Sequence, residues 1–432
     1  MDPVQELLQF IANAPTSFQA VDAAIDCLQG FIRLDEHETW QLEQGKNYLV
    51  TRNGSSVIAF RVPVGKPVGF QMVASHSDSP MFKLKEHAET EVQGKYIRLD
   101  TEGYGGMIMA SWLDRPLSVA GRVIVRQGNR LESRLVDLKR DMALIPNVAI
   151  HMNREINTGY TYRANVDMVP LWGSMQAKGS LMREIAACAG CREEEIAGHD
   201  LFLYNHMPGT VWGSEQALFS APRIDNLECA FASLRALVQA QPTDRVQVCA
   251  VFDNEEVGST SRQGANSTFL SDTLYRIAAA FGYASELPVL LGRSFMVSAD
   301  NAHAVHPNHP ELADPANAVW MNEGIVIKHS ANQKYTTDAV SEALFREVCD
   351  RKQIPVQHFA NRSDMRGGST LGNLSASHVS VPTLDIGLAQ LAMHSCFETA
   401  GVRDLDYMIH GMKAFYETCW TPMGDGTVTL EA

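Results

Sequence analysis

A hydrophobic segment that ends in three carboxylates constrains the fold of this chain more than any other feature. Residues 249–252 (CAVF) form an apolar, strand-like run, and Asp253, Glu255 and Glu256 follow at once. Like charges placed together beside a buried strand cost free energy unless a positive group lies next to them. The chain must therefore fold so that a compensating positive charge meets the end of this strand.

Three further strand-like runs end in residue types that bind metal ions: QMVAS before His76 and Asp78, FMVSA before Asp300, and LAQLAM before His394. In open α/β sheets, functional groups collect at the carboxyl ends of the strands. Asp225 is another candidate, because it stands where a helical pattern begins in LECAFASLRALV. We expect these side chains to share one site.

The charges of the candidate ligands balance if two metal ions are bound. The set comprises two neutral imidazoles and three carboxylates, namely those of His76, Asp225, Glu256, Asp300 and His394. Two divalent cations exceed the carboxylate charge by one, which a bridging hydroxide would neutralise. Zinc accepts nitrogen and oxygen ligands of this kind, and two-metal hydrolases hold their ions roughly 3.5–4 Å apart. A metal pair is therefore the positive group that the sequence predicts.

The two adjacent glutamates are assigned different roles. Neighbouring residues on an extended segment point apart, so Glu256 is predicted to be a ligand and Glu255 the general base. Asp78 follows His76 by two residues, and we expect its carboxylate to accept the other imidazole N–H and fix the tautomer of the ligand.

Each of these positions, taken alone, has a simpler interpretation. Asp225 and Glu228 match the D-x-x-E pattern of a helix capping box. The pair Glu255 and Glu256 would ordinarily be a solvated turn. A histidine after an apolar strand, such as His394, is more often a hydrogen-bonded core residue. Only their joint placement at strand and helix ends favours a metal site.

The pattern of helices and strands predicts an α/β protein with an insertion. Helix and strand alternate from Asp225 onward, which is typical of a largely parallel sheet. From about residue 90 to 215 the pattern is mostly antiparallel strands, including LSVAGRVIVRQGNRLESRLVDL, which turns at Gly128-Asn129. We expect a catalytic domain made of residues 1–90 and 216–432, with a β-rich domain at 91–215 between its two parts.

Composition excludes several classes of partner and favours the cytoplasm. The 432 residues carry a formal net charge of −14, which argues against nucleic acid and against an anionic membrane surface. No uncharged apolar run approaches the ~20 residues of a membrane span. The first basic residue is Arg33, which argues against a conventional signal peptide. Eight scattered cysteines suit reduced thiols better than disulfides.

Seven motifs, in this order, resemble those of the aspartyl aminopeptidase family of dinuclear zinc exopeptidases: SHSDSP, SAPRIDNL, FDNEEVGS, SADNAHAVHPNH, KYTTDA, GGSTLG and LAMHS. The resemblance covers nearly the whole chain. It implies that His76, Asp225 and Asp300 hold one zinc ion, and that Asp225, Glu256 and His394 hold the other. Asp225 would bridge the ions, Glu255 would shuttle the proton, and Asp78 would orient His76.

The resemblance also implies an assembly and a substrate pocket. The catalytic domain would have three αβα layers, and the insertion would be a dimerisation domain whose His151 reaches the active site of a neighbouring subunit. Dimers would build a tetrahedral dodecamer. Lys328 and Tyr335 fall where the family recognises an acidic side chain, and one histidine of the group at 303, 306 and 309, taken here as His303, would line the pocket.

The function predicted is removal of an N-terminal residue, preferably Asp or Glu, from peptides. Two zinc ions, with cobalt or manganese as substitutes, would activate a bridging water, and Glu255 would act as general base. A two-metal carboxypeptidase or deacylase is the alternative enzyme. A catalytically silent assembly scaffold is the non-enzymatic alternative, which the complete set of ligands and base disfavours.

Overall fold

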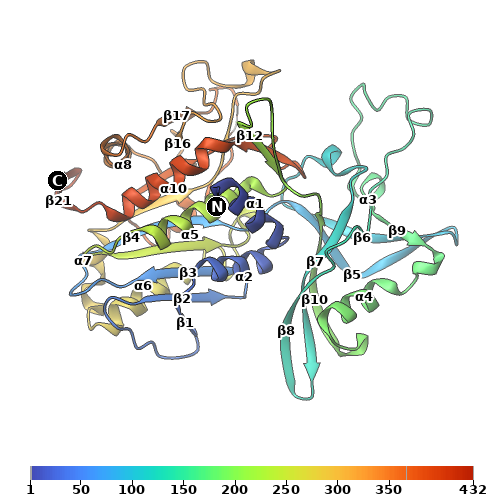
Figure 1. The fold of residues 1–432 in the computed structure, drawn as a ribbon, viewed down its shortest axis with the longest axis horizontal. Helices are drawn as coiled ribbons and strands as arrows, with labels where there is room; N and C mark the ends of the chain where they lie inside the picture. The colour runs from blue at the N-terminus through green and yellow to red at the C-terminus, as the bar shows by residue number, and fades with distance from the viewer. Residues whose placement is uncertain (1, 366, 432) are drawn as a thin grey trace.

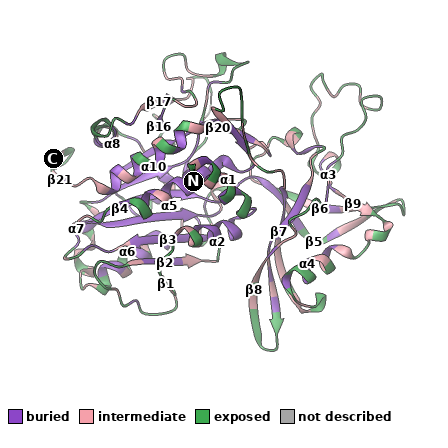
Figure 2. Ribbon diagram, viewed as in Figure 1, coloured by how far each residue is buried: buried purple, intermediate pink, exposed green. Residues whose placement is uncertain are grey.

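The computed structural model describes residues 2–365 and 367–431. An α/β body and a β-rich body lie side by side in Figure 1, with the β-rich part, residues 81–205, on the right. Figure 2 shows that the strands of the α/β body are mostly buried, whereas much of the β-rich body is exposed or half-buried.

A nine-stranded sheet within the described residues forms the centre of the α/β body. Its strands, in spatial order, are β1 (Ile32–Leu34), β2 (Asn47–Arg52), β3 (Ser56–Arg61), β13 (Val246–Phe252), β4 (Phe70–His76), β14 (Phe295–Ala299), β18 (Thr383–Gly387), β16 (Ile325–His329) and β17 (Val356–Ala360). The four strands from β13 to β18 pair in parallel. Their continuous hydrophobic runs are explained by helices that cover both faces of the sheet.

Helices pack on both faces of this sheet, which gives the three layers that were predicted. One face carries α1 (Pro3–Asn13), α2 (Ser17–Cys27), α5 (Ile224–Gln239), α8 (Ala339–Arg351) and α10 (Val402–Glu417). The other face carries α6 (Phe269–Ala280), α7 (Leu287–Leu291) and α9 (Leu371–Ser375). Within the described residues no helix is long and apolar enough to cross a membrane.

The β-rich body is an antiparallel sheet with its own hydrophobic core. Its elements are β5 (Met81–Val92), β6 (Tyr96–Tyr104), β7 (Leu117–Gln127), β8 (Arg130–Asp137), α3 (Ala164–Asp167), β9 (Leu171–Ser174), α4 (Ser180–Ala189) and β10 (Ile196–Asn205). Strand β5 already belongs to this sheet, so the sheet begins before residue 91. The remaining strands are β11 (Thr210–Trp212), β12 (Leu218–Ala221), β15 (Ala302–His303), β19 (Ala389–Leu391), β20 (Glu398–Gly401), β21 (Trp420–Gly424) and β22 (Thr427–Leu430).

One predicted strand is divided between two sheets. The run LAQLAM before His394 is the end of a longer hydrophobic segment, VPTLDIGLAQLAM (residues 381–393), whose pattern predicts a single strand. The chain instead leaves the central sheet after β18 and joins the small sheet of β15, β19 and β20. Hydrophobic residues continue through both strands because both are buried, so periodicity alone does not mark the change of sheet.

Candidate metal centre

The register of the parallel strands brings the predicted ligands together. Phe252, the last residue of β13, pairs with His76, the last residue of β4. On the other side of β4, Ser298 of β14 pairs with Ala74, which places Asp300 beside the end of β4. The residues that follow β13, β4 and β14 therefore meet at one edge of the sheet, as expected for an open α/β fold.

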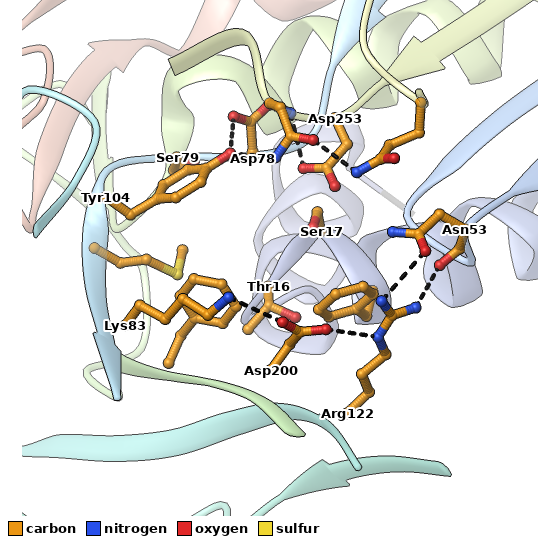
Figure 3. A pocket seen from close by; sticks show the side chains of 15 residues that line it. Thr16, Ser17, Asn53, Asp78, Ser79, Lys83, Tyr104, Arg122, Asp200 and Asp253 are labelled. Atoms are coloured by element: carbon orange, nitrogen blue, oxygen red, sulfur yellow. Dashed lines mark hydrogen bonds and ion pairs between the residues drawn. The ribbon is translucent and has the colours of Figure 1, made fainter. Parts of the chain in front are cut away.

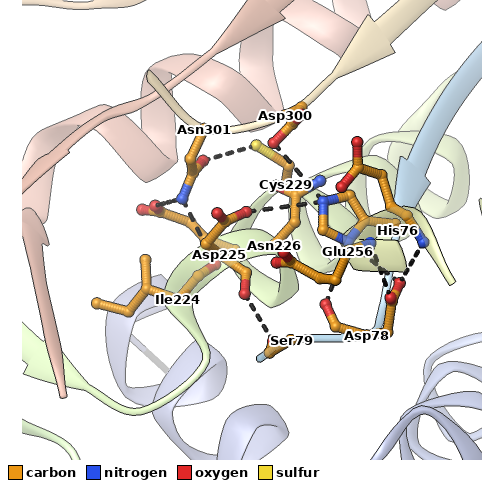
Figure 4. A network of polar contacts seen from close by, with 12 residues as sticks. His76, Asp78, Ser79, Ile224, Asp225, Asn226, Cys229, Glu256, Asp300 and Asn301 are labelled. Atoms are coloured by element: carbon orange, nitrogen blue, oxygen red, sulfur yellow. Dashed lines mark hydrogen bonds and ion pairs between the residues drawn. The ribbon is translucent and has the colours of Figure 1, made fainter. Parts of the chain in front are cut away.

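His76 faces two of the predicted carboxylate ligands through one ring nitrogen. Its Nε2 atom lies 3.6 Å from Oδ1 of Asp300 and 3.7 Å from Oδ1 of Asp225. Its Nδ1 atom lies 3.4 Å from Oδ1 of Asp78 and 3.1 Å from the Asp78 carbonyl oxygen. Figure 4 shows these side chains converging from β4, from the start of α5 and from the loop after β14. This ring is positioned with one nitrogen toward the carboxylates and the other toward Asp78.

A second group of potential ligands meets on the other side of Asp225. Nε2 of His394 lies 3.3 Å from Oδ2 of Asp225 and 3.3 Å from Oε2 of Glu256. In each group, His76–Asp225–Asp300 and Asp225–Glu256–His394, the potential ligand atoms all lie within 4.8 Å of one another. Asp225 belongs to both groups, so a single carboxylate joins two adjacent sites.

The polar atoms at this centre fit a cation. Oδ1 of Asp225 and Oε1 of Glu256 are buried without a hydrogen-bond partner in the described part of the chain. Buried acceptors without a partner are rare and costly. Burial, together with the negative charge of Asp225, raises the pKa of Glu256 well above its usual value. Divalent cations would satisfy these oxygens and offset the repulsion, and the imidazole and carboxylate donors suit zinc.

Asp78 also holds the turn that carries the two glutamates. Its Oδ1 accepts the backbone N–H of Glu255 and its Oδ2 accepts that of Glu256, each at 3.1 Å. The Tyr104 hydroxyl donates a further hydrogen bond to Oδ2 at 2.7 Å. The segment Glu255–Val257 is a 3₁₀ turn rather than the extended end that was assumed. Anchoring of both N–H groups by one carboxylate explains the tighter backbone.

Glu255 stands beside both groups of potential ligands. Burial and the nearby carboxylates of Asp300, Asp78 and Asp225 raise the pKa of Glu255 to about 8, against the lowering effect of His76. Glu255 and Glu256 also form a compact group with His76. By distance alone, either Glu255 or Glu256 could ligate a metal ion near His76.

The third carboxylate of the opening motif points to a different place. Asp253 lines a cavity of about 180 Å³ between the α/β body and the β-rich body. In Figure 3 it lies near Asp78 and Ser17, while Asp200 is held by Lys83 at 2.9 Å and by Arg122 at 3.0 Å. Burial and the charge of Asp78 raise the pKa of Asp253 to about 7. Asp253 is thus a buried carboxyl behind the centre.

The structure rules out the simpler interpretation at three positions. The Asp225 backbone N–H donates to Glu398, and the Glu228 carboxylate accepts from Asn301, so Asp225 and Glu228 are not a capping box. The Glu256 side chain is only 3% exposed, unlike that of a solvated turn. The His394 side chain is 34% exposed, unlike that of a core histidine.

The residues predicted to bind substrate lie close to one another in the described chain. The rings of His303 and Tyr335 lie 6.2 Å and 6.4 Å from that of Phe359, centroid to centroid. Nζ of Lys328 lies 5.3 Å from the Tyr335 ring centroid and donates a hydrogen bond to the Asn301 carbonyl at 2.7 Å. Lys328 is buried.

His151 lies away from these groups in its own chain. It stands in the irregular segment between β8 and α3, where its side chain is exposed. Among the described residues it forms no hydrogen bond or ion pair, and neither group of potential ligands includes it. The neighbouring Val148, Ile150 and Met152 are exposed as well, the last by 82%.

Sequence reasoning missed a buried carboxylate that supports two ligands. Oε2 of Glu398 accepts the backbone N–H of Asp225 at 2.9 Å, and Oε1 accepts that of His394 at 2.7 Å. The signal was available, because Glu398 follows His394 by four residues in MHSCFE.

A glycine pair from the β-rich body also contacts the centre. In the turn after β6, a Cβ on Gly105 would lie 3.0 Å from Cβ of Glu256, and one on Gly106 would lie 4.0 Å from Nδ1 of His394. The GYGGM sequence is therefore a turn that packs against the metal centre.

An α/β sheet with two joined His–carboxylate groups at its carboxyl edge defines a metallohydrolase, and comparisons with known proteins identify its family. A family model described as aminopeptidase I zinc metalloprotease (M18) matches residues 10–416. A Clostridium acetobutylicum protein named as an M18 family aminopeptidase 2 is 44% identical, with 95% of this chain and 98% of the relative covered. A similarly named Pseudomonas fluorescens protein is 39% identical, with coverages of 95% and 97%.

Solved structures agree with this result. A cryo-EM structure of the Ape4 and Nbr1 complex superposes with a TM-score of 0.93 at 34% identity, covering 96% of this chain and 85% of the other. The mApe1 dodecamer of S. cerevisiae gives a TM-score of 0.86 at 28% identity, covering 96% of both chains. The chain belongs to the M18 family of zinc metallopeptidases and is an aminopeptidase.

Proposed function

We propose that this aminopeptidase removes acidic N-terminal residues from peptides at a centre of two zinc ions. The observation that carries the proposal is the pair of ligand groups that share Asp225. His76, Asp225 and Asp300 would hold one ion, and Asp225, Glu256 and His394 the other. Zinc bound there supplies Lewis-acid activation of the scissile carbonyl and of water. Cobalt or manganese would substitute, as they accept the same ligand types.

Glu255 is the general base in this proposal. It stands beside both groups, and its N–H donates to Asp78, which holds the 3₁₀ turn in place. The Glu255 carboxylate accepts the proton of the attacking water and returns it to the leaving amine. Asp78 holds His76 and the Glu255 turn together, so it positions a ligand and the base at once.

Preference for an acidic residue would come from Lys328. Lys328 is 2% exposed, and among the described residues no carboxylate lies within the 4.0 Å of an ion pair with it. Burial lowers its pKa, but the charges of Asp300, Tyr335 and Asp385 raise it further, so it stays protonated. A buried cation without a close anion favours an anionic ligand. The carboxylate of a substrate Asp or Glu would supply it.

Substitution of Lys328 tests this preference. We expect Lys328→Met to lower kcat/KM for an aspartyl substrate about 10–100-fold, the effect of one charged hydrogen bond, and to leave an alanyl substrate little changed. The control is Lys334→Met, at an exposed lysine of the following segment. An equal loss on both substrates would refute selective recognition. No preference for acidic residues in the wild type would refute the substrate class.

Assembly and location complete the proposal. The exposed apolar residues beside His151, namely Val148, Ile150 and Met152, favour burial against another subunit. We propose a dimer formed through the β-rich body, with His151 reaching the neighbour's metal centre, and a tetrahedral dodecamer built from such dimers in the cytoplasm. The dodecameric mApe1 structure supports the assembly by similarity.

A further inference from the structure

A second cluster of metal-ligand residues lies at the edge of the central sheet. His329 is the last residue of β16, His358 lies in the neighbouring strand β17, and Glu342 lies in the first turn of α8, which connects the two strands. The labels of β16, β17 and α8 lie next to one another in Figure 1. Successive residues of a strand point to opposite faces, so His329 faces α8 while its neighbour Lys328 faces the substrate pocket.

The distances within this cluster match a tetrahedral metal site. Nε2 of His329 lies 3.3 Å from Nδ1 of His358, which lies 3.5 Å from Oε1 of Glu342. Oε2 of Glu342 lies 4.0 Å from Nε2 of His329. Ligands bound to zinc at about 2.0–2.1 Å in a tetrahedron lie about 3.3–3.4 Å from one another. The two histidines have this spacing, His358 and Glu342 exceed it slightly at 3.5 Å, and rotation of the carboxylate would bring in the third pair.

Charge and exposure also suit a bound cation. Glu342 supplies a negative charge beside the two imidazole rings of His329 and His358. The side chains of His329, Glu342 and His358 are 33%, 23% and 37% exposed, which leaves a fourth position open to solvent. Nη1 of Arg346 lies 3.7 Å from Oε1 of Glu342 and offsets part of the carboxylate charge.

We propose that His329, Glu342 and His358 form a third divalent-cation site, separate from the catalytic pair. Two imidazoles and one carboxylate select zinc or a similar transition metal over magnesium or calcium. The ion would join β17, an edge strand, to β16 and α8. Because β16 carries Lys328, the ion would also stiffen the wall of the substrate pocket. The proposal does not depend on the substrate or on the catalytic mechanism.

Zinc content measured after equilibrium dialysis tests the site directly. The wild type is expected to bind one zinc ion more per chain than His358→Ala, whatever number the catalytic centre holds. Glu342→Gln provides a second variant if the first folds poorly. Exposed His410 of α10 provides the matched control, His410→Ala, which should retain the full wild-type content.

Thermal unfolding gives a second readout. Zinc added to the wild type should raise Tm through this site, because an ion that binds only the folded chain stabilises it. That part of the rise should be absent in His358→Ala, while aminopeptidase activity at saturating zinc remains. Equal zinc content in the wild type and both variants would overturn the proposal and leave a hydrogen-bonded His–His–Glu cluster.

Discussion

At the scale of single residues, the centre is a set of carboxylates whose environments differ within a few ångströms. Burial opposes ionisation of Asp300, yet Lys328 and His76 lower its pKa to about 2. Glu255, a short distance away, has its pKa raised to about 8. Such different properties fit the proposed roles, in which Asp300 holds a cation and Glu255 moves a proton.

Exchange of each glutamate for glutamine separates these tasks. We expect Glu255→Gln to retain two zinc ions and lose kcat by at least ~10²–10⁴-fold, the usual effect of removing a general base. Glu256→Gln should instead lower the zinc content toward one ion per chain. Metal analysis beside kinetics provides the measurement. If Glu255→Gln lost metal and Glu256→Gln stayed active, the two roles would be exchanged.

The raised pKa of Asp253 predicts how the free energy of unfolding depends on pH. Its pKa is raised to about 7 from an unfolded value of about 3.9, so the folded state holds the proton more tightly. This contribution is fully present below pH ~4, where it amounts to about 4 kcal/mol at most, and it is lost as pH rises through ~7. The amide of Asp253→Asn does not titrate, so the Tm of this variant should rise relative to that of the wild type as the pH increases from 5 to 8.

Thermal unfolding of both proteins across that pH range provides the measurement. Asp350→Asn, at an exposed position of α8, serves as control and should follow the wild type. A constant difference in Tm between Asp253→Asn and the wild type at all pH values would contradict the prediction.

At the scale of elements, the sequence pattern predicts where strands and helices form better than it predicts which strands pair with one another. The hairpin at Asn53-Gly54 and the break at Pro15 follow from local chemistry, and both are present between β2 and β3 and between α1 and α2. The move of the chain from β18 into the small sheet has no local signal, because both strands are buried. The 3₁₀ turn of Glu255 depends on Asp78, which is distant in sequence.

In the candidate site, too, features with a local signal could be predicted, and features that depend on contacts between distant segments could not. Residue types at strand ends predicted the groups around His76 and Asp225, because parallel register brings such ends to one edge. Glu398 and the Gly105 turn act through backbone contacts and packing between segments far apart in the chain. Such contacts leave no periodic pattern, so only the folded structure reveals them.

Glu398 connects the start of α5 to the turn after β19, and its substitution tests that connection. In Glu398→Gln, an amide NH₂ would face one of the two N–H groups that the carboxylate now accepts. We expect zinc affinity or kcat/KM to fall about 10–100-fold, as for other groups that orient metal ligands. Exposed Glu215→Gln is the control. Unchanged zinc affinity with a lowered Tm would mean that Glu398 serves stability alone.

At the scale of the whole molecule, the β-rich body carries an exposed segment that fits the proposed contact with a neighbouring chain. It contacts its own catalytic centre through the Gly105 turn and carries His151 away from that centre on an exposed segment. A body with its own hydrophobic core can present such a segment without disturbing the central sheet.

Mixed assemblies test whether His151 serves a neighbouring site. His151→Ala and Glu255→Gln should each be inactive alone. After exchange of subunits in equal amounts, about a quarter of the sites would combine an intact Glu255 with an intact His151 from the partner, since half the dimers are mixed and each has one complete site. Exchange is first shown with tagged chains. No recovery of activity after proven exchange would mean that His151 does not act between subunits.

The distance in sequence between the two histidines of the centre has a consequence for synthesis. His76 and Asp78 precede the β-rich body, Asp225 follows it, and His394 comes close to the end of the 432 residues. At about 5–20 residues per second, a ribosome needs roughly 15–60 s to travel from His76 to His394. During that time the nascent chain has no complete second site for metal. A newly made chain thus cannot bring the second group of potential ligands together until His394 has been synthesised.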